Sequence, residues 1–195
     1  MTSLEKKIID YVEANKEDLY KELSYLLRFD STNYITWGKE LECAEYIADE
    51  YRKLGLEPDL YCPDNIPGLI SHPEYLPGRG TDKRPNVTAV LKGTKGNGSA
   101  MLAAHIDTVS IGDPAAWKHD PFGGEISDGR IWGRGAGDDK SGIAMSLFAM
   151  RTLKALNIKL KKDVLFTAYC DEESGGGNGA LAACLKYPCD AYINI

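Results

Sequence analysis

The sequence lacks the features that mark membrane-spanning and nucleic-acid-binding proteins. No apolar stretch approaches the ~18 residues that a transmembrane helix needs, and the first residues show no signal-peptide pattern. No run of basic residues stands out, and the net charge is −6. These absences disfavour membranes and nucleic acids as partners, and we expect a cytoplasmic protein.

Closely spaced cysteine pairs are also missing. The 5 cysteines are scattered, odd in number and without a C-x-x-C motif, which favours free thiols in a reducing compartment over a disulfide framework.

The sequence has no internal repeat and no low-complexity segment. With 43% hydrophobic and 27% charged residues in a chain of 195, we expect a soluble globular protein with one core or two small domains.

Hydrophobic periodicity predicts helices and strands in alternation. The expected helices are 4–29, 39–54, 139–156 and 178–186. The expected strands are 58–62, 87–93, 99–107, 163–170 and 191–195, with two short strands around the turn at Asp128 and Gly129. Residues 93–98 suit a tight reversal between the second and third of these strands, and 62–86 is expected to be a long ordered loop. This pattern predicts an α/β sandwich with a largely buried sheet.

The stretch MLAAHIDTVS, residues 101–110, ends an apolar strand with a histidine and an aspartate. Side chains two positions apart on a strand share a face, so His105 and Asp107 are expected on the same side. A metal-bound histidine usually donates its second ring N–H to a carboxylate, and Asp107 is placed to accept it directly or through the turn. A structural histidine is the alternative, and this stretch alone favours it.

The stretch GRGAGDDK, residues 133–140, places glycines before an expected helix. Its G-x-G-x-G pattern is a weak match to a dinucleotide-binding loop. Asp138 and Asp139 at the helix start would repel a phosphate and attract a cation. Acids there also complement the helix dipole, so helix capping and metal binding both stay open, and a nucleotide is less favoured.

The stretch AYCDEESGGGNG, residues 168–179, opens a buried strand into three acids, Asp171, Glu172 and Glu173. Solvated loop acids are one interpretation. In the other, one glutamate holds a metal while its neighbour faces a bound water, which is the division of labour that metal hydrolases need.

Together the three stretches favour a metal site. His105 and Glu173 each follow an apolar strand, and Asp138 follows a glycine turn into a helix, so all three can meet at the carboxyl edge of the sheet. Imidazole and carboxylates without thiolate suit zinc or a similar divalent ion. The other histidines, His72 and His119, are expected to be structural or surface residues. Trp117 and Phe122 are expected to pack in the core or within their loop in preference to lining the mouth of the site.

The motifs HID, GRGAGDDKSG and DEESG resemble the patterns H-x-D, G-R-G-A-x-D-x-K-x-G and D-E-E-x-G of a known family. This family is the dinuclear zinc amidohydrolases and exopeptidases, which include acetylornithine deacetylase, succinyl-diaminopimelate desuccinylase, aminoacylase and carboxypeptidase G. The motifs have the family's order and approximate spacing, and the resemblance spans nearly the whole chain. It implies a zinc-exopeptidase-like fold, a three-layer sandwich in which helices flank a mixed sheet.

The resemblance also implies a role for each site residue. His105 is expected to bind one zinc, with Asp107 orienting it, and Glu173 to bind the other. Asp138 is expected to bridge both metals and to precede a non-proline cis peptide bond. Glu172 is expected to be the general base. The implied cofactors are two divalent metal ions, with Zn²⁺ expected first and Co²⁺ or Mn²⁺ as alternatives.

The activity that follows is hydrolysis of an amide bond in a small N-acyl amino acid or short peptide by a water that two zinc ions activate. Because family members are much longer, residues 1–195 are expected to form the N-terminal portion of a metallohydrolase catalytic domain. The lid or dimerisation domain and the C-terminal part, with further ligands, would be absent. We therefore expect the isolated chain to bind metal weakly and to have little activity, and a homodimer stays open for the full-length form. The alternative is a non-catalytic fragment that acts as a binding or regulatory module.

Overall fold

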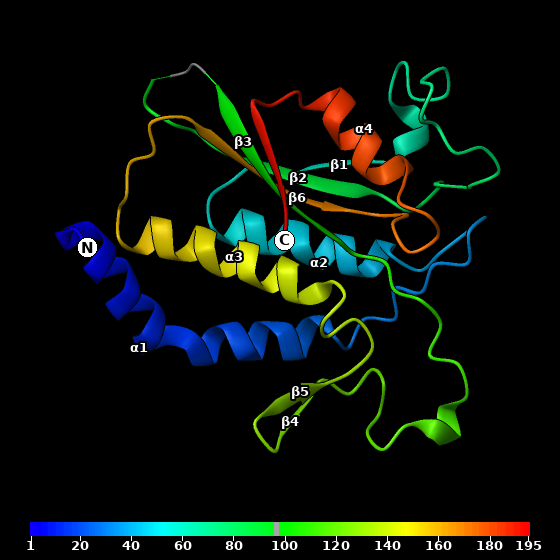
Figure 1. Cartoon of the computed structure of the whole chain (residues 1–195), viewed down its shortest axis with the longest axis horizontal. Coiled ribbons are helices and arrows are strands. Elements are labelled where there is room, and N and C mark those ends of the chain that lie inside the picture. Colours follow the sequence, from blue (N-terminus) through cyan, green and yellow to red (C-terminus); the bar gives the residue numbers. More distant parts are fainter. Residues whose placement is uncertain (96–97) are drawn as a thin grey trace.

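The computed structural model describes residues 1–95 and 98–195, and at its centre lies a mixed sheet of five strands in the order β1-β2-β6-β3-β7 (Figure 1). The strands of this sheet are β1 (Asp59–Tyr61), β2 (Asn86–Leu91), β3 (Ser99–His105), β6 (Asp163–Tyr169) and β7 (Ala191–Asn194). A separate hairpin contains β4 (Glu125–Ser127) and β5 (Arg130–Trp132). The helices are α1 (Ser3–Leu26), α2 (Leu41–Lys53), α3 (Lys140–Ala155) and α4 (Asn178–Lys186), with short 3₁₀ turns at Pro63–Asn65 and Pro114–Ala116.

Helices cover both faces of the sheet. In Figure 1, α1, α2 and α3 lie on one side and α4 lies on the other. Leu147 of α3 and Phe166 of β6 belong to the core on the first side, whereas Met101 of β3 and Ala183 of α4 belong to the core on the second. All four side chains are fully buried. The predicted three-layer sandwich with a mixed sheet is therefore confirmed.

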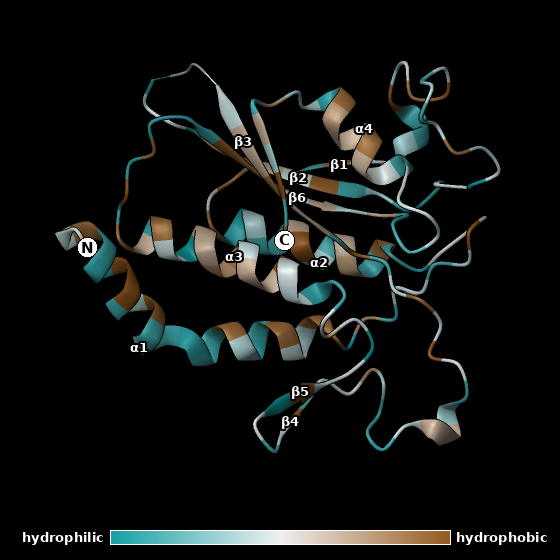
Figure 2. Cartoon of the chain, viewed as in Figure 1, coloured by the Kyte–Doolittle hydropathy of each residue, from teal (hydrophilic) through white to brown (hydrophobic). Residues whose placement is uncertain are grey.

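The helices differ in how much of their surface is apolar. Figure 2 shows α3 as mostly hydrophobic, whereas α1 carries hydrophilic stretches between its apolar residues. Helix α3 packs against both α1 and β3. A helix with neighbours on two sides needs an apolar surface on both, whereas an outer helix needs only one apolar stripe.

Two crossover connections bring the ends of β3 and β6 together. The chain leaves β3, passes through α3 and returns as β6, which is parallel to β3 and pairs with it. It then passes through α4 and returns as β7 on the other side of β3. Right-handed crossovers that run in opposite directions place their helices on opposite faces. Since His105 pairs with Tyr169, the carboxyl ends of β3 and β6 lie side by side.

The expected tight reversal between β2 and β3 does not form a hairpin of paired strands. Strand β6 lies between them, antiparallel to β2 and parallel to β3. Residues 96 and 97 of that reversal lie outside the described residues. Because all three strands are apolar, the hydrophobic pattern cannot tell which two are neighbours.

The remaining elements lie close to their predicted positions. Helix α4 has the predicted bounds, the hairpin β4-β5 turns at Asp128 and Gly129, and the long loop begins with a 3₁₀ turn and leads into β2. The sheet is largely buried except at β7, whose residues are all exposed. No helix in the described part of the chain combines the length and the apolar character needed to cross a membrane.

Candidate metal centre

Three residues that are far apart in the sequence meet at the carboxyl edge of the sheet. His105 ends β3, Asp138 lies in the turn before α3, and Glu173 lies in the turn after β6. One potential ligand atom from each residue lies within 4.8 Å of the other two. His105 Nε2 is 2.8 Å from Asp138 Oδ1. The structure thus brings the three predicted ligands together, while their role as ligands stays a prediction.

The register of the two strands explains this convergence. His105 pairs with Tyr169, and the Ile106 N–H donates to the Tyr169 carbonyl oxygen at 2.7 Å. Asp171 then turns the chain with φ +62°, in the left-handed region that only a few per cent of non-glycine residues adopt. Glu172 and Glu173 follow this turn immediately and therefore emerge beside His105.

The His105 ring is oriented by the backbone of Asp107. Its Nδ1 lies 2.9 Å from the Asp107 carbonyl oxygen. Because a carbonyl oxygen can only accept, Nδ1 donates, and Nε2 faces Asp138. The Asp107 carboxylate is 3.6 Å from Nδ1. Of the two routes that the sequence left open, the bond through the turn is the one that the structure contains.

The Asp107 carboxylate organises the opposite side of the site. It accepts hydrogen bonds from the backbone N–H groups of Glu172, at 3.0 Å, and Glu173, at 3.1 Å. It also accepts from Asn33 Nδ2 at 2.7 Å. Burial alone would raise the pKa of Asp107, but the nearby His105 ring and the hydrogen bond from Asn33 lower it. Sequence reasoning did not find Asn33, because a polar residue in a loop carries no signal that it is buried.

Glu172 is the fourth acidic group at the site. Its Oε2 lies 3.8 Å from His105 Nε2, and its side chain is 36% exposed. The carboxylate is therefore close to the predicted ligands and still reachable from solvent, as a group that exchanges protons with a water must be.

Residues 101–195 match a family model described as Peptidase family M20/M25/M40. This segment contains every predicted ligand and both predicted catalytic residues. This segment of the chain is a domain of the M20 peptidase family.

Individual relatives of this M20 chain are much longer than it is. The N-formyl-4-amino-5-aminomethyl-2-methylpyrimidine deformylase of Halalkalibacterium halodurans is 33% identical over 194 residues, which are 98% of this chain and 41% of the relative. A succinyl-diaminopimelate desuccinylase of Cereibacter sphaeroides is 58% identical over 98 residues, 50% of this chain and 26% of the relative. Human carnosine dipeptidase 1 superimposes with a TM-score of 0.71 and 17% identity over 97% of this chain and 40% of that chain. The chain thus matches less than half the length of each relative.

The charges at the M20 site favour a cation. Burial lowers the pKa of His105, but Asp107 and Asp138 outweigh it and raise the pKa to about 10. Burial raises the pKa of Asp139 to about 6, and burial together with Asp138 raises the pKa of Glu173. Carboxylates are thus crowded around one imidazole, and nitrogen and oxygen donors without sulfur suit zinc or another borderline or hard divalent ion.

The turn that carries Asp138 is fixed to β3. The peptide bond between Asp138 and Asp139 is cis, as the family resemblance implied. Asp139 Oδ2 accepts from the His105 backbone N–H at 3.1 Å. Lys140 is fully buried and donates from Nζ to the Phe29 carbonyl oxygen at 2.6 Å. These bonds hold the turn between the end of α1 and the end of β3.

The remaining candidates lie in loops. His119 pairs with Glu125 at 2.8 Å and stacks on Trp132, and the His72 ring accepts from the Glu74 backbone N–H. Trp117 Nε1 donates to the Ile111 carbonyl oxygen, which is packing within its own loop. Phe122 is half-buried and lies in the same loop region.

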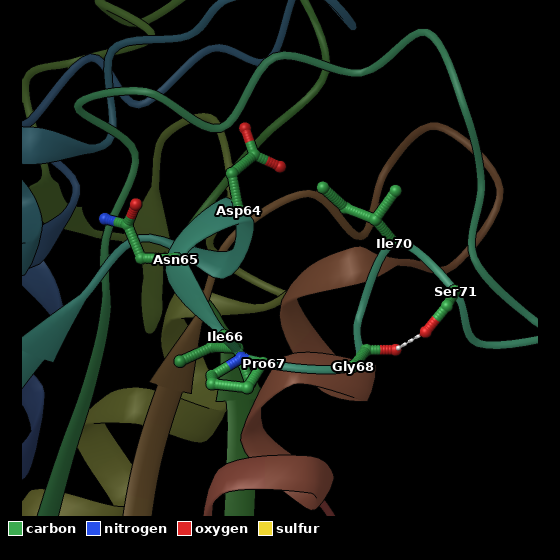
Figure 3. A pocket seen from close by; sticks show the side chains of 7 residues that line it. All are labelled: Asp64, Asn65, Ile66, Pro67, Gly68, Ile70 and Ser71. Atoms are coloured by element: carbon green, nitrogen blue, oxygen red, sulfur yellow. Dashed lines mark hydrogen bonds between the residues drawn. The ribbon is translucent and has the colours of Figure 1, made fainter.

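A separate pocket lies on the long loop before β2 (Figure 3). It is lined by Asp64, Asn65, Ile66, Pro67, Gly68, Ile70 and Ser71. Figure 3 shows Ser71 Oγ donating to the Gly68 carbonyl oxygen, at 3.2 Å. None of the predicted site residues lines this pocket, so it is distinct from the candidate metal centre.

Proposed function

We propose that this M20 chain carries part of the active site of a metal-dependent amide hydrolase, whose substrate is a small N-acyl amino acid or a short peptide. The observation that carries the proposal is the convergence of His105, Asp138 and Glu173 within 4.8 Å, with the Glu172 carboxylate 3.8 Å from His105 Nε2. Relatives named as a deformylase, a desuccinylase and a dipeptidase support this class of reaction.

The residues that would hold two divalent cations are His105, Asp138 and Glu173. His105 would offer Nε2 to one cation, Glu173 its carboxylate to the other, and Asp138 a carboxylate shared by both. Zn²⁺ is the ion we propose, and Co²⁺ or Mn²⁺ would suit the same donors. When bound, such cations supply Lewis acidity toward a carbonyl oxygen and lower the pKa of a water.

Glu172 would move the proton in this reaction. Its carboxylate takes a proton from the attacking water as the water oxygen bonds to the acyl carbon. It then gives that proton to the leaving nitrogen as the amide bond breaks. Asp107 supports both glutamates by accepting from their backbone N–H groups, and His105 is held by the bond from its Nδ1.

We also propose that residues 1–195 are the N-terminal portion of the catalytic domain. The chain matches about 40% of the length of human carnosine dipeptidase 1, and the other ligands would come from chain outside these residues. The isolated chain would then bind metal weakly and have little activity.

Replacing Glu172 with glutamine tests the central role. In the full-length protein, Glu172→Gln is expected to lower hydrolysis of N-acyl amino acids by about 10²- to 10⁴-fold, while bound zinc, measured by mass spectrometry, stays unchanged. Glu125→Gln is the matched control, because Glu125 is exposed and pairs with His119. Full activity in Glu172→Gln would remove Glu172 from the role. Zinc binding without hydrolysis in the unmutated protein would favour a binding or regulatory module instead.

A further inference from the structure

Behind the candidate ligands lies a buried cluster of four charged side chains, Glu40, Arg79, Arg84 and Asp171. The side chains of Glu40, Arg84 and Asp171 are 0% exposed, and that of Arg79 is 9% exposed. Two acids face two guanidinium groups, so the cluster is balanced in charge. Buried ions carry a large desolvation cost, so their arrangement calls for a specific explanation.

Arg84 is the centre of this cluster. Its Nε donates to Glu40 Oε1 at 2.9 Å, and its Nη2 lies 2.7 Å from the same oxygen. Nη1 donates to the Gly80 carbonyl oxygen at 2.8 Å and to the Ile35 carbonyl oxygen at 3.2 Å. Nη2 is also 3.6 Å from Asp171 Oδ1. One side chain thus joins the start of α2, two loops and the turn after β6.

The first path from Arg84 leads to the two glutamates. Asp171 Oδ1 accepts a hydrogen bond from Arg79 Nη1 at 2.8 Å, and Arg84 Nη2 forms a longer ion pair with the same oxygen, at 3.6 Å. Asp171 has φ +62°, a conformation that the surrounding contacts must support. Because Glu172 and Glu173 follow directly, fixing Asp171 fixes the direction in which they leave the strand.

The second path leads to the histidine. Ile35 has φ +69°, which is unusual for a β-branched residue, and its N–H donates to Asn33 Oδ1 at 2.7 Å. Asn33 in turn donates to Asp107, whose carbonyl oxygen orients the His105 ring. Arg84 therefore connects to both sides of the candidate metal centre.

We propose that Arg84 is a positioning residue that fixes the turn of Asp171, Glu172 and Glu173 and so presents the two glutamates to His105. What the glutamates do once positioned rests on the proposed function. The positioning itself is a statement about the turn and can be tested without metal.

Two variants separate positioning from general stability. Arg84→Met removes every contact of the guanidinium group. Arg84→Met combined with Glu40→Met replaces the buried pair with apolar side chains, an exchange that is often neutral for stability, but it leaves the contacts to Asp171 and Ile35 unmade. Arg151→Met is the matched control, because Arg151 binds two glutamates, Glu22 and Glu50, on the helices.

The first measurement is amide hydrogen exchange of the metal-free chain by NMR. We expect protection of the Glu172 and Glu173 amides to fall at least tenfold in the double variant, relative to amides of α3 in the same sample. In Arg151→Met the ratio should stay as in the unmutated chain. Unchanged protection of Glu172 and Glu173 in the double variant would overturn the proposal, because the turn would then hold without Arg84.

The second measurement is titration with Zn²⁺, followed by calorimetry. Loss of a residue that orients ligands typically weakens metal affinity about 10- to 100-fold, and we expect this in the double variant and not in Arg151→Met. If the Glu172 and Glu173 amides lose protection while the zinc affinity stays unchanged, the idea that this turn orients the metal ligands is overturned. If the unmutated chain shows no zinc binding at all, the proposed function has lost support, and hydrogen exchange alone decides the role of Arg84.

Discussion

Two arginines each form ion pairs with two acidic side chains. The first arginine, Arg84, lies beside the candidate site, and the second, Arg151, lies within the helical layer. Arg84 lies among loops with a side chain that is 0% exposed, between Glu40 and Asp171. Arg151 lies on α3 with a side chain that is 24% exposed, and its Nη2 is 2.5 Å from both Glu22 of α1 and Glu50 of α2. The same combination of one arginine and two acids thus occurs in two different surroundings.

The difference shows where a fold needs buried charge. At Arg151, helices α1, α2 and α3 already satisfy their own backbone groups, so the arginine pairs with side chains alone: it is 24% exposed, and Glu22 and Glu50 are buried between the helices. At Arg84, loops approach the ends of the strands, and their carbonyl groups lack regular partners. The guanidinium group supplies donors to two of these carbonyls, those of Ile35 and Gly80.

The largest expected effect is on stability. Arg84→Met leaves Glu40 and Asp171 buried with too few cations, and breaking a buried ion pair in this way costs about 3–5 kcal/mol. Arg151→Met should cost less than Arg84→Met, because Arg151 is 24% exposed and its two buried acids keep other donors, Tyr46 for Glu22 and Lys53 for Glu50. Urea unfolding followed by circular dichroism measures both.

The dependence of the two stability losses on ionic strength tests this first comparison further. The cost of Arg151→Met should shrink in 1 M salt, where the Debye length falls to about 3 Å, because Arg151 is partly exposed, whereas the cost of Arg84→Met should persist. Equal losses in the two variants would mean that the two clusters do not differ in the way their burial suggests.

The sequence predicted the elements and the convergence of the three candidate ligands better than the other long-range contacts. His105, Asp138 and Glu173 could be found because each follows a strand or a glycine turn, and strand ends meet at one edge of a sheet. Periodicity similarly located α4 at its observed bounds. These features depend on neighbours in sequence, which a pattern records.

The parts that sequence reasoning missed depend on distant neighbours. Nothing in the local pattern places β6 between β2 and β3. Arg84 follows a lysine in a loop rich in proline and glycine, where a charged residue is usually solvated, yet it is fully buried. Asn33 is missed for the same reason. Only the folded chain surrounds these polar groups with partners.

Helix α3 begins beside the candidate metal centre and carries Arg151 near its other end. Gly142, in the first turn of this helix, is the subject of the second prediction. Replacing a helical glycine with alanine ordinarily stabilises by about 1 kcal/mol. At Gly142, however, a Cβ would lie 2.6 Å from Asp139 Oδ1 and 2.9 Å from the Ala104 Cβ. We expect a net loss of about 1–2 kcal/mol, since overpacking costs about 1–3 kcal/mol.

The control for Gly142→Ala lies at the other end of the same helix. Lys154→Ala changes an exposed position in the last turn of α3 and should alter stability by about 0.5 kcal/mol at most. Thermal unfolding compares the two variants. A stabilised Gly142→Ala would show that β3 and α3 can separate at the site without cost.

The smallest expected effect is on the local opening of the two regions. Two buried thiols, Cys170 and Cys43, serve as probes of this opening. Cys170 Sγ donates to the Arg84 carbonyl oxygen at 3.0 Å, whereas Cys43 lies in α2, in the core beneath the helices. Burial raises the pKa of Cys43 to about 11 and also raises the pKa of Cys170. Neither thiol should react with iodoacetamide near neutral pH until its surroundings open, because the thiolate is the reactive form. The exposed Cys184 reports reagent activity in the same sample.

Peptide mass spectrometry then measures the alkylation rate of each thiol. We expect Arg84→Met to increase labelling of Cys170 more than labelling of Cys43, and Arg151→Met to do the reverse, because each arginine supports its own region. Regions of one domain can open separately when their local stabilities differ. If both variants increase the two rates by the same factor, global unfolding governs exposure. The loops around Arg84 and the helices around Arg151 would then be a single cooperative unit, and the contrast between them would be one of geometry alone.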